Sequence, residues 1–207
     1  MYGLKSVDNG DVANQIRLLF LQRFKPHFHI IMIETKIKAT VRDVQDFPKP
    51  GITFKDITPI LKDHGLCTEI AAALAEQLNG LKIDVVAGIE SRGFLFGPAL
   101  AQLLKVPFVP IRKAGKLPYK TIQESYALEY GEATIEVHED ALLSGQRVLI
   151  HDDLLATGGT VVAASKLIEK LGAEVAGYSF VISLDFLKGA ERLSPYTDQV
   201  FSMAAYE

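Results

Sequence analysis

The stretch from Val148 to Gly172 reads VLIHDDLLATGGTVVAASKLIEKLG, and it combines three local patterns. Val148-Leu149-Ile150 is a short β-branched and apolar run, which is typical of a buried strand. From Val161 to Leu171 the apolar residues recur at helical spacing, and Gly172 is a natural helix end. Small and hydroxyl-bearing residues lie between the two runs. The stretch therefore predicts a strand, a tight loop and a helix.

The predicted loop has the chemistry of an anion site beside two carboxylates. A glycine-rich loop that opens a helix directs free N–H groups and the positive end of the helix dipole to one point, which suits a phosphate. The loop lacks the lysine of GxxxxGK[ST] and the spacing of GxGxxG, which excludes those two nucleotide sites. Asp152 and Asp153 would repel an anion unless they bound ribose hydroxyls, directly or through hydrated Mg²⁺. These residues suggest a ribose 5-phosphate ligand; an ordinary turn with two solvated aspartates is the alternative.

The whole string is more specific than its parts. DDLLATGGT behind an apolar strand resembles the phosphoribosyl pyrophosphate motif of the type I phosphoribosyltransferases, and the double leucine resembles the form found in adenine phosphoribosyltransferases. His151 departs from the family, which usually has an aliphatic residue there. Strand alternation points His151 away from Asp152, so we interpret it as a packing residue. The resemblance assigns Asp152 and Asp153 to the ribose hydroxyls. It assigns the 5-phosphate to the loop residues Ala156, Thr157, Gly158, Gly159 and Thr160.

A second segment, DFPKPGITFKDITPIL from Asp46 to Leu61, is similar to the amino-terminal hood of the adenine phosphoribosyltransferases. The resemblance implies that Phe54 stacks on the purine, that Lys55 reads its edge, and that Leu184 packs on its other face. Many family members have arginine in place of Lys55. If the main chain makes this contact, the exchange changes nothing; if a guanidinium makes it, base affinity is altered.

Two polar turns follow strand-like runs and resemble the family's pyrophosphate sites. The first follows Ile83 to Ile89, where the family has a non-proline cis peptide. The second, after Val106 to Ile111, matches the family's mobile loop. Taken alone, such cations are usually solvated, but both turns are expected at the carboxyl edge of one parallel sheet, where α/β ligands bind. The pyrophosphate-binding residues that the resemblance implies are Glu90, Ser91 and Arg92, and Arg112, Lys113 and Lys116.

The sequence SYALEYG, from Ser125 to Gly131, continues into a strand-like run at Thr134 to Val137, which predicts a β-hairpin arm. The pattern resembles the family's flexible lid. It implies that Glu129 is the catalytic acid/base and that Tyr130 supports the closed loop. The role of Glu129 stays open between handling a purine ring proton and stabilising the ribosyl cation.

Composition sets broad limits on the chain. Its 207 residues fit one domain, and 22 basic against 25 acidic residues give a net charge of −3, which argues against a general nucleic-acid binder. The single cysteine, Cys67, excludes an internal disulfide and suggests a reducing cytoplasm. Cys67 lies in a helical apolar pattern, so we predict a buried structural thiol. No run approaches the roughly 18 apolar residues of a membrane span.

The amino-terminal part is expected to contribute least. Ile33, Ile37, Val41 and Val44 recur at helical spacing and predict a helix that ends before Pro48. We predict that residues 1–31 are a dispensable extension; a helix that packs on the hood or on a dimer and an organellar presequence are the alternatives. Residues 32–207 are then a single phosphoribosyltransferase domain, with the hood at about 32–62 and the core at about 63–207.

The resemblance covers about Asp46 to Leu184 and implies a type I phosphoribosyltransferase fold, an α/β architecture with a mostly parallel sheet flanked by helices, an amino-terminal hood and a flexible β-hairpin lid. It implies a homodimeric enzyme that makes AMP and pyrophosphate from adenine and phosphoribosyl pyrophosphate, and the single cysteine leads us to expect a cytoplasmic location. Mg²⁺ would be held by pyrophosphate, ribose and water rather than by a protein ligand set, and neither nucleic acid nor membrane is an expected partner. The alternatives are another purine base, or a non-enzymatic purine regulator, which would carry a basic winged-helix region.

Overall fold

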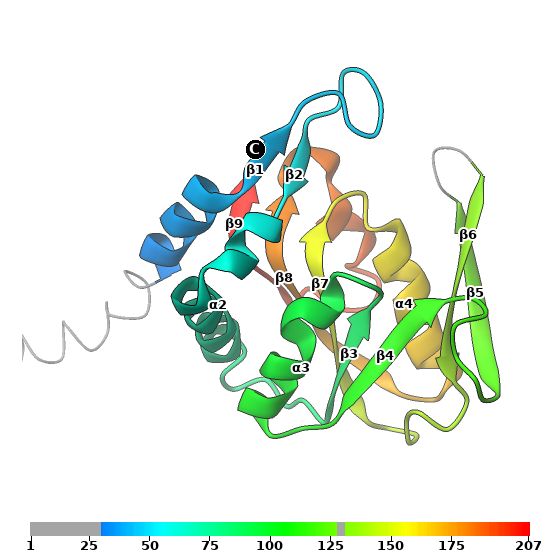
Figure 1. Cartoon of the computed structure of the whole chain (residues 1–207). Helices are drawn as coiled ribbons and strands as arrows, with labels where there is room; N and C mark the ends of the chain where they lie inside the picture. Colours follow the sequence, from blue (N-terminus) through cyan, green and yellow to red (C-terminus); the bar gives the residue numbers. More distant parts are fainter. Residues whose placement is uncertain (1–29, 128–130) are drawn as a thin grey trace, which may run out of the picture.

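A seven-stranded sheet forms the centre of the computed structural model, which describes residues 30–127 and 131–207 (Figure 1). The strand order is β5-β6-β4-β3-β7-β8-β9. The five parallel strands are β3 (Val85–Ile89), β4 (Phe108–Lys113), β7 (Arg147–Leu155), β8 (Glu174–Leu184) and β9 (Val200–Tyr206). Neighbouring β7 and β8 are mostly buried along their lengths, as expected of strands covered on both faces.

The predicted hairpin arm is present at the other end of the sheet. Strands β5 (Thr121–Ala127) and β6 (Glu132–His138) pair antiparallel, and β6 also pairs antiparallel with β4. In Figure 1 the arm stands away from the rest of the sheet at its far end. β9 forms the opposite edge of the sheet.

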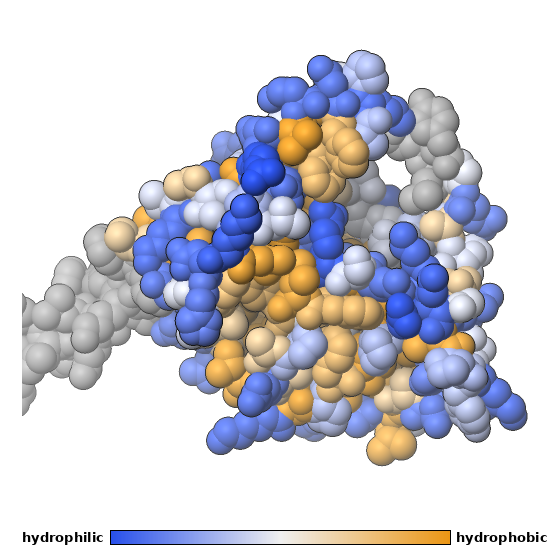
Figure 2. Space-filling model, in the orientation of Figure 1, coloured by the Kyte–Doolittle hydropathy of each residue, from blue (hydrophilic) through white to orange (hydrophobic). Residues whose placement is uncertain are grey.

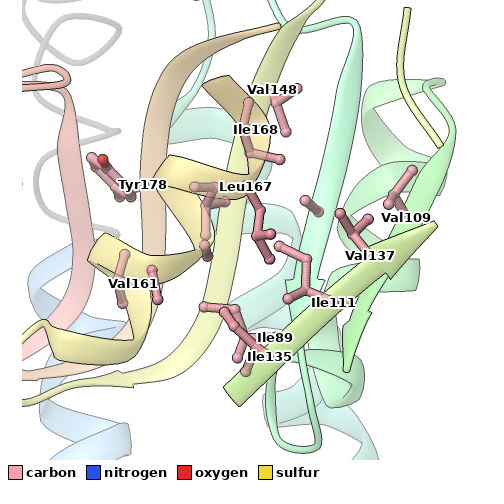
Figure 3. Close-up of a cluster of buried hydrophobic side chains, with 14 of the residues drawn as sticks. Ile89, Val109, Ile111, Ile135, Val137, Val148, Val161, Leu167, Ile168 and Tyr178 are labelled. Atoms are coloured by element: carbon pink, nitrogen blue, oxygen red, sulfur yellow. The ribbon is translucent and has the colours of Figure 1, made fainter. Parts of the chain in front are cut away.

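Helices cover both faces of the sheet and enclose two buried clusters. Helix α4 (Gly159–Lys170) places Val161, Leu167 and Ile168 against β3, β4 and β7, as Figure 3 shows. The helix at residues 30–40, together with α2 (His64–Gln77) and α3 (Gly93–Leu104), packs on the opposite face. The alternation of strand side chains sends Val85 and Ala87 to one cluster and Val86 to the other. The predicted α/β class is confirmed.

The hood is built differently from the prediction in one respect. The helix ends at residue 40, and Arg42–Val44 form strand β1, which pairs antiparallel with β2 (Phe54–Asp56). The expectation that helical spacing continues through Val44 was therefore wrong. Val44 pairs with Phe54, ten residues further along the chain, and this strand pairing overrides the local helical pattern. A 3-10 helix, η1 (Thr58–Lys62), completes the hood.

Strand β7 is also longer than its apolar run suggests. The two aspartates lie inside the strand, because β8 continues beside it and pairs Asp152 with Phe180 and Leu155 with Ser183. Two short 3-10 helices follow β8, η2 (Asp185–Leu187) and η3 (Gly189–Arg192). Cys67 is half-buried, its thiol donates to the Ile60 carbonyl at 3.3 Å, and burial raises the pKa of that thiol.

The parallel strands bring distant segments of the sequence to one edge. β3, β4, β7 and β8 end at Ile89, Lys113, Leu155 and Leu184, and their carboxyl ends face the same way. The segments that follow these strands include most of the residues singled out from the sequence. No helix in the described ranges is long and apolar enough to cross a membrane.

Candidate active site

The loop after β7 and the start of α4 form the first part of the site. Gly158 adopts φ +77°, and a Cβ atom there would lie 2.9 Å from the Gly189 carbonyl oxygen, so the loop needs glycine for both its backbone angle and its packing. Helix α4 begins at Gly159 without a side-chain cap. The first N–H groups of a helix have no intrahelical partner, so this end is suited to an anion.

The two aspartates at the end of β7 have different surroundings. Asp153 is 1% exposed, and neither of its carboxylate oxygens accepts a well-formed hydrogen bond within the described part of the chain. Asp152 is half-buried and accepts from the Asp153 backbone N–H at 2.8 Å. Burial raises the pKa of both carboxyls, and the charge of Asp153 raises that of Asp152 further. Unsatisfied buried oxygens need hydroxyl or cationic partners, so solvated aspartates are not an adequate description.

Arg92 connects this carboxylate pair with the hood. Its Nε atom lies 3.2 Å from Asp153 Oδ1, and its Cζ atom lies 5.4 Å from the centroid of the Phe54 ring. Arg92 immediately precedes α3, whose first residue, Gly93, packs so closely on β7 that a Cβ atom would meet the His151 carbonyl oxygen at 2.6 Å. Glycine at position 93 therefore allows the arginine to stand beside the aspartates.

The turn that precedes Arg92 contains a cis peptide bond between Glu90 and Ser91, as the resemblance implies. The Glu90 carboxylate is engaged by the neighbouring strand. Arg112 donates to it through Nε at 3.0 Å and Nη2 at 3.3 Å, and the Lys113 backbone N–H donates at 3.0 Å. Burial opposes ionisation, but these donors and the two cations lower the pKa of Glu90. Glu90 therefore holds cations in place rather than presenting a carboxylate to an anion.

The hood residues are arranged around Phe54. Phe47 packs edge-to-face on Phe54 with 5.2 Å between ring centroids, and Arg92 lies over the Phe54 ring. The Lys55 side chain contacts Asp43 and Tyr206: its Nζ lies 2.7 Å from Asp43 Oδ1 and 4.4 Å from the centroid of the Tyr206 ring. Leu184 is half-buried at the carboxyl end of β8. The Lys55 ammonium is thus committed to an ion pair, which leaves its main chain as the group available to a base.

Two residues near the site had no signal in the sequence. Arg192, in η3, donates from Nη1 to the Thr157 carbonyl at 3.1 Å and so contacts the loop before α4. Glu136, in β6, is 2% exposed and accepts from the backbone N–H groups of Lys116 and Leu117. Both contacts join segments far apart in sequence, which no local pattern can predict.

The arm is fastened to the core by a charged cluster. Glu124, in β5, lies 2.9 Å from Lys166 Nζ and 2.6 Å from Lys170 Nζ, both on α4. Lys170 also donates to the Gln123 carbonyl at 3.1 Å. These contacts direct the end of β5 toward the start of α4. The predicted catalytic Glu129 and the predicted lid residue Tyr130 lie outside the described residues.

The carboxylate pair meets the general requirements of a site for a hydrated divalent cation and a diol. Asp153 contributes two buried oxygens without a hydrogen bond among the described residues, of which Oδ1 is near Arg92, and Asp152 lies beside it. No cluster of three or more His, Cys, Asp or Glu side chains with metal-binding geometry occurs within 30–127 and 131–207. A cation at this pair would therefore need ligands from a substrate and water as well.

Comparison with known proteins agrees with the geometry. Residues 57–203 match the family described as "Phosphoribosyl transferase domain". The chain is 55% identical over 175 residues to the adenine phosphoribosyltransferase of Cytophaga hutchinsonii, which covers 84% of this chain and 97% of the relative. It is 55% identical over 170 residues to that of Acidobacterium capsulatum, covering 82% and 93%.

Solved structures of adenine phosphoribosyltransferases are also similar to this chain. The adenine phosphoribosyltransferase of Thermoanaerobacter pseudethanolicus superposes with a TM-score of 0.80 at 49% identity, covering 83% of this chain and 99% of the other. The Saccharomyces cerevisiae protein, crystallised with adenine and an imino-altritol bisphosphate, gives 0.77 at 41% identity and covers 84% and 99%. The chain belongs to the adenine phosphoribosyltransferase family and has the type I phosphoribosyltransferase fold.

Proposed function

We propose that this protein transfers the 5-phosphoribosyl group of phosphoribosyl pyrophosphate to adenine, forming AMP and pyrophosphate. The observation that carries the proposal is the buried Asp153, whose oxygens lack well-formed hydrogen bonds, beside Arg92 and ahead of the loop that opens α4. A ribose with a phosphate at one end and a pyrophosphate at the other would supply hydroxyl donors to Asp153, an anion to Arg92 and a phosphate to the loop that opens α4. The relatives' names supply the identity of the base.

In this proposal, each group around the sugar has one task. Asp152 and Asp153 accept from the ribose hydroxyls. The loop from Ala156 to Thr160 binds the 5-phosphate through backbone N–H groups and threonine hydroxyls, and Arg192 supports that loop through the Thr157 carbonyl. The positive end of α4 faces the phosphate. The substrate is thereby held at both ends of its ribose, with C1 exposed to the base.

The leaving group is bound by the other two segments. Arg92 and the Glu90–Ser91 turn bind pyrophosphate from one side. Lys113, at the end of β4, and Lys116, in the loop that follows, approach it from the other side, while Glu90 keeps the Arg112 guanidinium in place. These cations stabilise the charge that develops as the C1–O bond breaks. Mg²⁺, held by pyrophosphate, ribose and water rather than by a protein ligand set, would supply further neutralisation of that charge.

Adenine binds between the hood and the end of β8, with Phe54 on one face and Leu184 on the other. The phenyl ring is already oriented by Phe47, and base stacking on it is worth roughly 1–3 kcal/mol. The Lys55 side chain is paired with Asp43, so its main chain reads the base edge, and an arginine at this position is not required. Glu129, assigned from the sequence alone, acts as acid/base or stabilises the ribosyl cation.

The test is incorporation of radiolabelled adenine, hypoxanthine, guanine and xanthine in parallel reactions with phosphoribosyl pyrophosphate and Mg²⁺. We expect AMP to form efficiently and IMP, GMP and XMP to form far more slowly. A site that accepts from a 6-amino group leaves its acceptor unpaired against a 6-oxo group, which typically costs several orders of magnitude in specificity. Efficient synthesis of IMP or GMP would refute the choice of adenine.

We also propose that the protein acts as a homodimer in the cytoplasm. Helices α2 and α3 leave a groove lined by Leu61, Leu95 and Leu103, which are 41%, 40% and 50% exposed (Figure 2). Such an apolar groove on a water-facing surface favours a protein partner, and a second copy is the partner that the family implies. Sedimentation should give a dimer for the native chain and a monomer for Leu103→Glu; a native monomer would refute this assembly.

The cytoplasmic location rests on the free thiol of Cys67.

A further inference from the structure

Glu136 is a buried carboxylate beneath the basic loop, which we define as residues 112–120. It lies in the middle of β6, between Ile135 and Val137, whose side chains pack into the core. Because side chains alternate along a strand, Glu136 points to the other face of β6, where the basic loop crosses. The side chain is only 2% exposed, so it faces the loop and not solvent.

The Glu136 carboxylate is fully used by the basic loop and by β5. Its Oε1 atom accepts from the backbone N–H groups of Lys116 and Leu117, both at 2.9 Å. Its Oε2 atom accepts from Thr121 Oγ1 at 3.2 Å and Gln123 Nε2 at 3.1 Å. Burial opposes ionisation, but these donors lower the pKa of Glu136, so the group is a carboxylate at neutral pH. A charged acceptor makes these bonds stronger than a neutral one would.

The peptide groups of Lys116 are held from both sides. The N–H of Lys116 donates to Glu136, and its carbonyl accepts from Arg112 Nη1 at 3.1 Å. Arg112 is the cross-strand partner of Glu136, and its guanidinium is fixed by Glu90. Two carboxylates thus fix the backbone of a loop that carries four cations. The side chain of Lys116 is exposed and takes no part in this network.

We propose that Glu136 is a positioning residue that sets the main chain of the basic loop so that the Lys116 ammonium meets the pyrophosphate group. The inference rests on the proposed function, in which Lys116 binds pyrophosphate. Glu136 itself touches no substrate and acts through the backbone of residue 116. Without it, the N–H groups of Lys116 and Leu117 lose their acceptor. The loop then keeps the bond from the Ala114 N–H to the Thr134 carbonyl on β6 but loses the contact with β6 at Lys116 itself.

A double-mutant cycle on the full chain tests this. The variants are Glu136→Ala, Lys116→Ala and the pair together, and each is assayed in both directions of the reaction. We expect Glu136→Ala and Lys116→Ala each to raise KM for phosphoribosyl pyrophosphate and for pyrophosphate by roughly tenfold, with KM for adenine unchanged. In the Lys116→Ala background, Glu136→Ala should add no more than about a twofold effect. Glu136→Gln, which keeps one oxygen acceptor, should recover most of the affinity.

Glu139→Gln is the matched control, because Glu139 follows β6, is exposed, and within the described part of the chain its carboxylate makes one long ion pair, with Lys120 at 3.8 Å. It should leave every constant unchanged. If Lys116→Ala has no effect on either KM, the assigned role of Lys116 in pyrophosphate binding fails. If Lys116→Ala weakens pyrophosphate binding but Glu136→Ala does not, or if the two effects multiply, the positioning role of Glu136 is wrong. If Glu136→Ala does not fold, wild-type KM values for phosphoribosyl pyrophosphate and pyrophosphate in Glu136→Leu overturn it equally.

Discussion

His151 shows how one residue next to a functional pair can serve packing alone. Its ring is completely buried, with Nδ1 3.2 Å from Ser179 Oγ and Nε2 without a hydrogen-bond partner in the described part of the chain. Burial lowers the pKa of His151 to about 4. The imidazole is therefore neutral at physiological pH, and its low pKa and complete burial make it a poor proton acceptor, which agrees with the packing role predicted from strand alternation.

The lowered pKa of His151 makes a stability prediction. The unfolded chain binds a proton near pH 6.5, whereas the folded chain does so only near pH 4, so stability falls as pH drops through this window. Between pH 7 and pH 5 the native chain should lose roughly 2 kcal/mol more unfolding free energy than His151→Val. Urea titrations at the two pH values measure it. Equal losses in both proteins would contradict the assignment, because all other titrating groups are shared.

Glu129 carries a prediction that comes from the sequence alone. A carboxylate that handles a proton or stabilises the ribosyl cation acts mainly in the transition state. Glu129→Gln should therefore lower kcat with little change in either KM. Single-turnover measurements at saturating substrates separate chemistry from product release. Retention of the full single-turnover rate would exclude Glu129 as the catalytic group.

At the scale of elements, the loop before α4 is constrained by the segment behind it. Gly158 has φ +77° and no room for a Cβ atom, whereas Gly145 has φ +78° and nothing within 4 Å. Gly145→Ala should lower the unfolding free energy only by the cost of placing alanine at a positive φ, about 1 kcal/mol. Gly158→Ala should cost more and should also raise KM for phosphoribosyl pyrophosphate. Thermal melts and initial rates for both variants test this, and equal behaviour of the two would show that the contact with η3 is unimportant.

Elements with a strong local hydrophobic pattern were predictable from the sequence. Elements and contacts that depend on pairing with distant segments were not. The apolar runs of β3 and β7 and the helical spacing of α2 and α4 appear where periodicity placed them. The helix before β1 was predicted too long, because the pairing of Val44 with Phe54 is a non-local contact. For the same reason the roles of Glu136 and Arg192 were missed. Motif resemblance supplied candidate residues, whereas the partners of Glu90 and Lys55 required the fold.

At the scale of the whole molecule, the question is where the working chain begins. In the helix at residues 30–40, Ile33 and Ile37 are buried, whereas Ile31 and Met32 are 46% and 47% exposed. A chain that starts at Met32 therefore keeps the buried residues of this helix. Residues 32–207 should melt within about 2 °C of the full chain and turn over at the same rate. A fall of several degrees, or loss of the dimer, would mean that residues 1–31 pack on the enzyme.

The central claim is that the buried carboxylate pair binds the ribose in a reaction that makes AMP. The most direct measurement is KM for phosphoribosyl pyrophosphate in AMP formation at saturating adenine, for the native chain and Asp153→Asn. Asparagine keeps the shape but removes the charge that strengthens hydrogen bonds from the ribose. We predict AMP formation by the native chain and a loss of about 1–3 kcal/mol in the variant, roughly a 5- to 150-fold rise in KM. No AMP from the native chain, or an unchanged KM in the variant, would contradict the account.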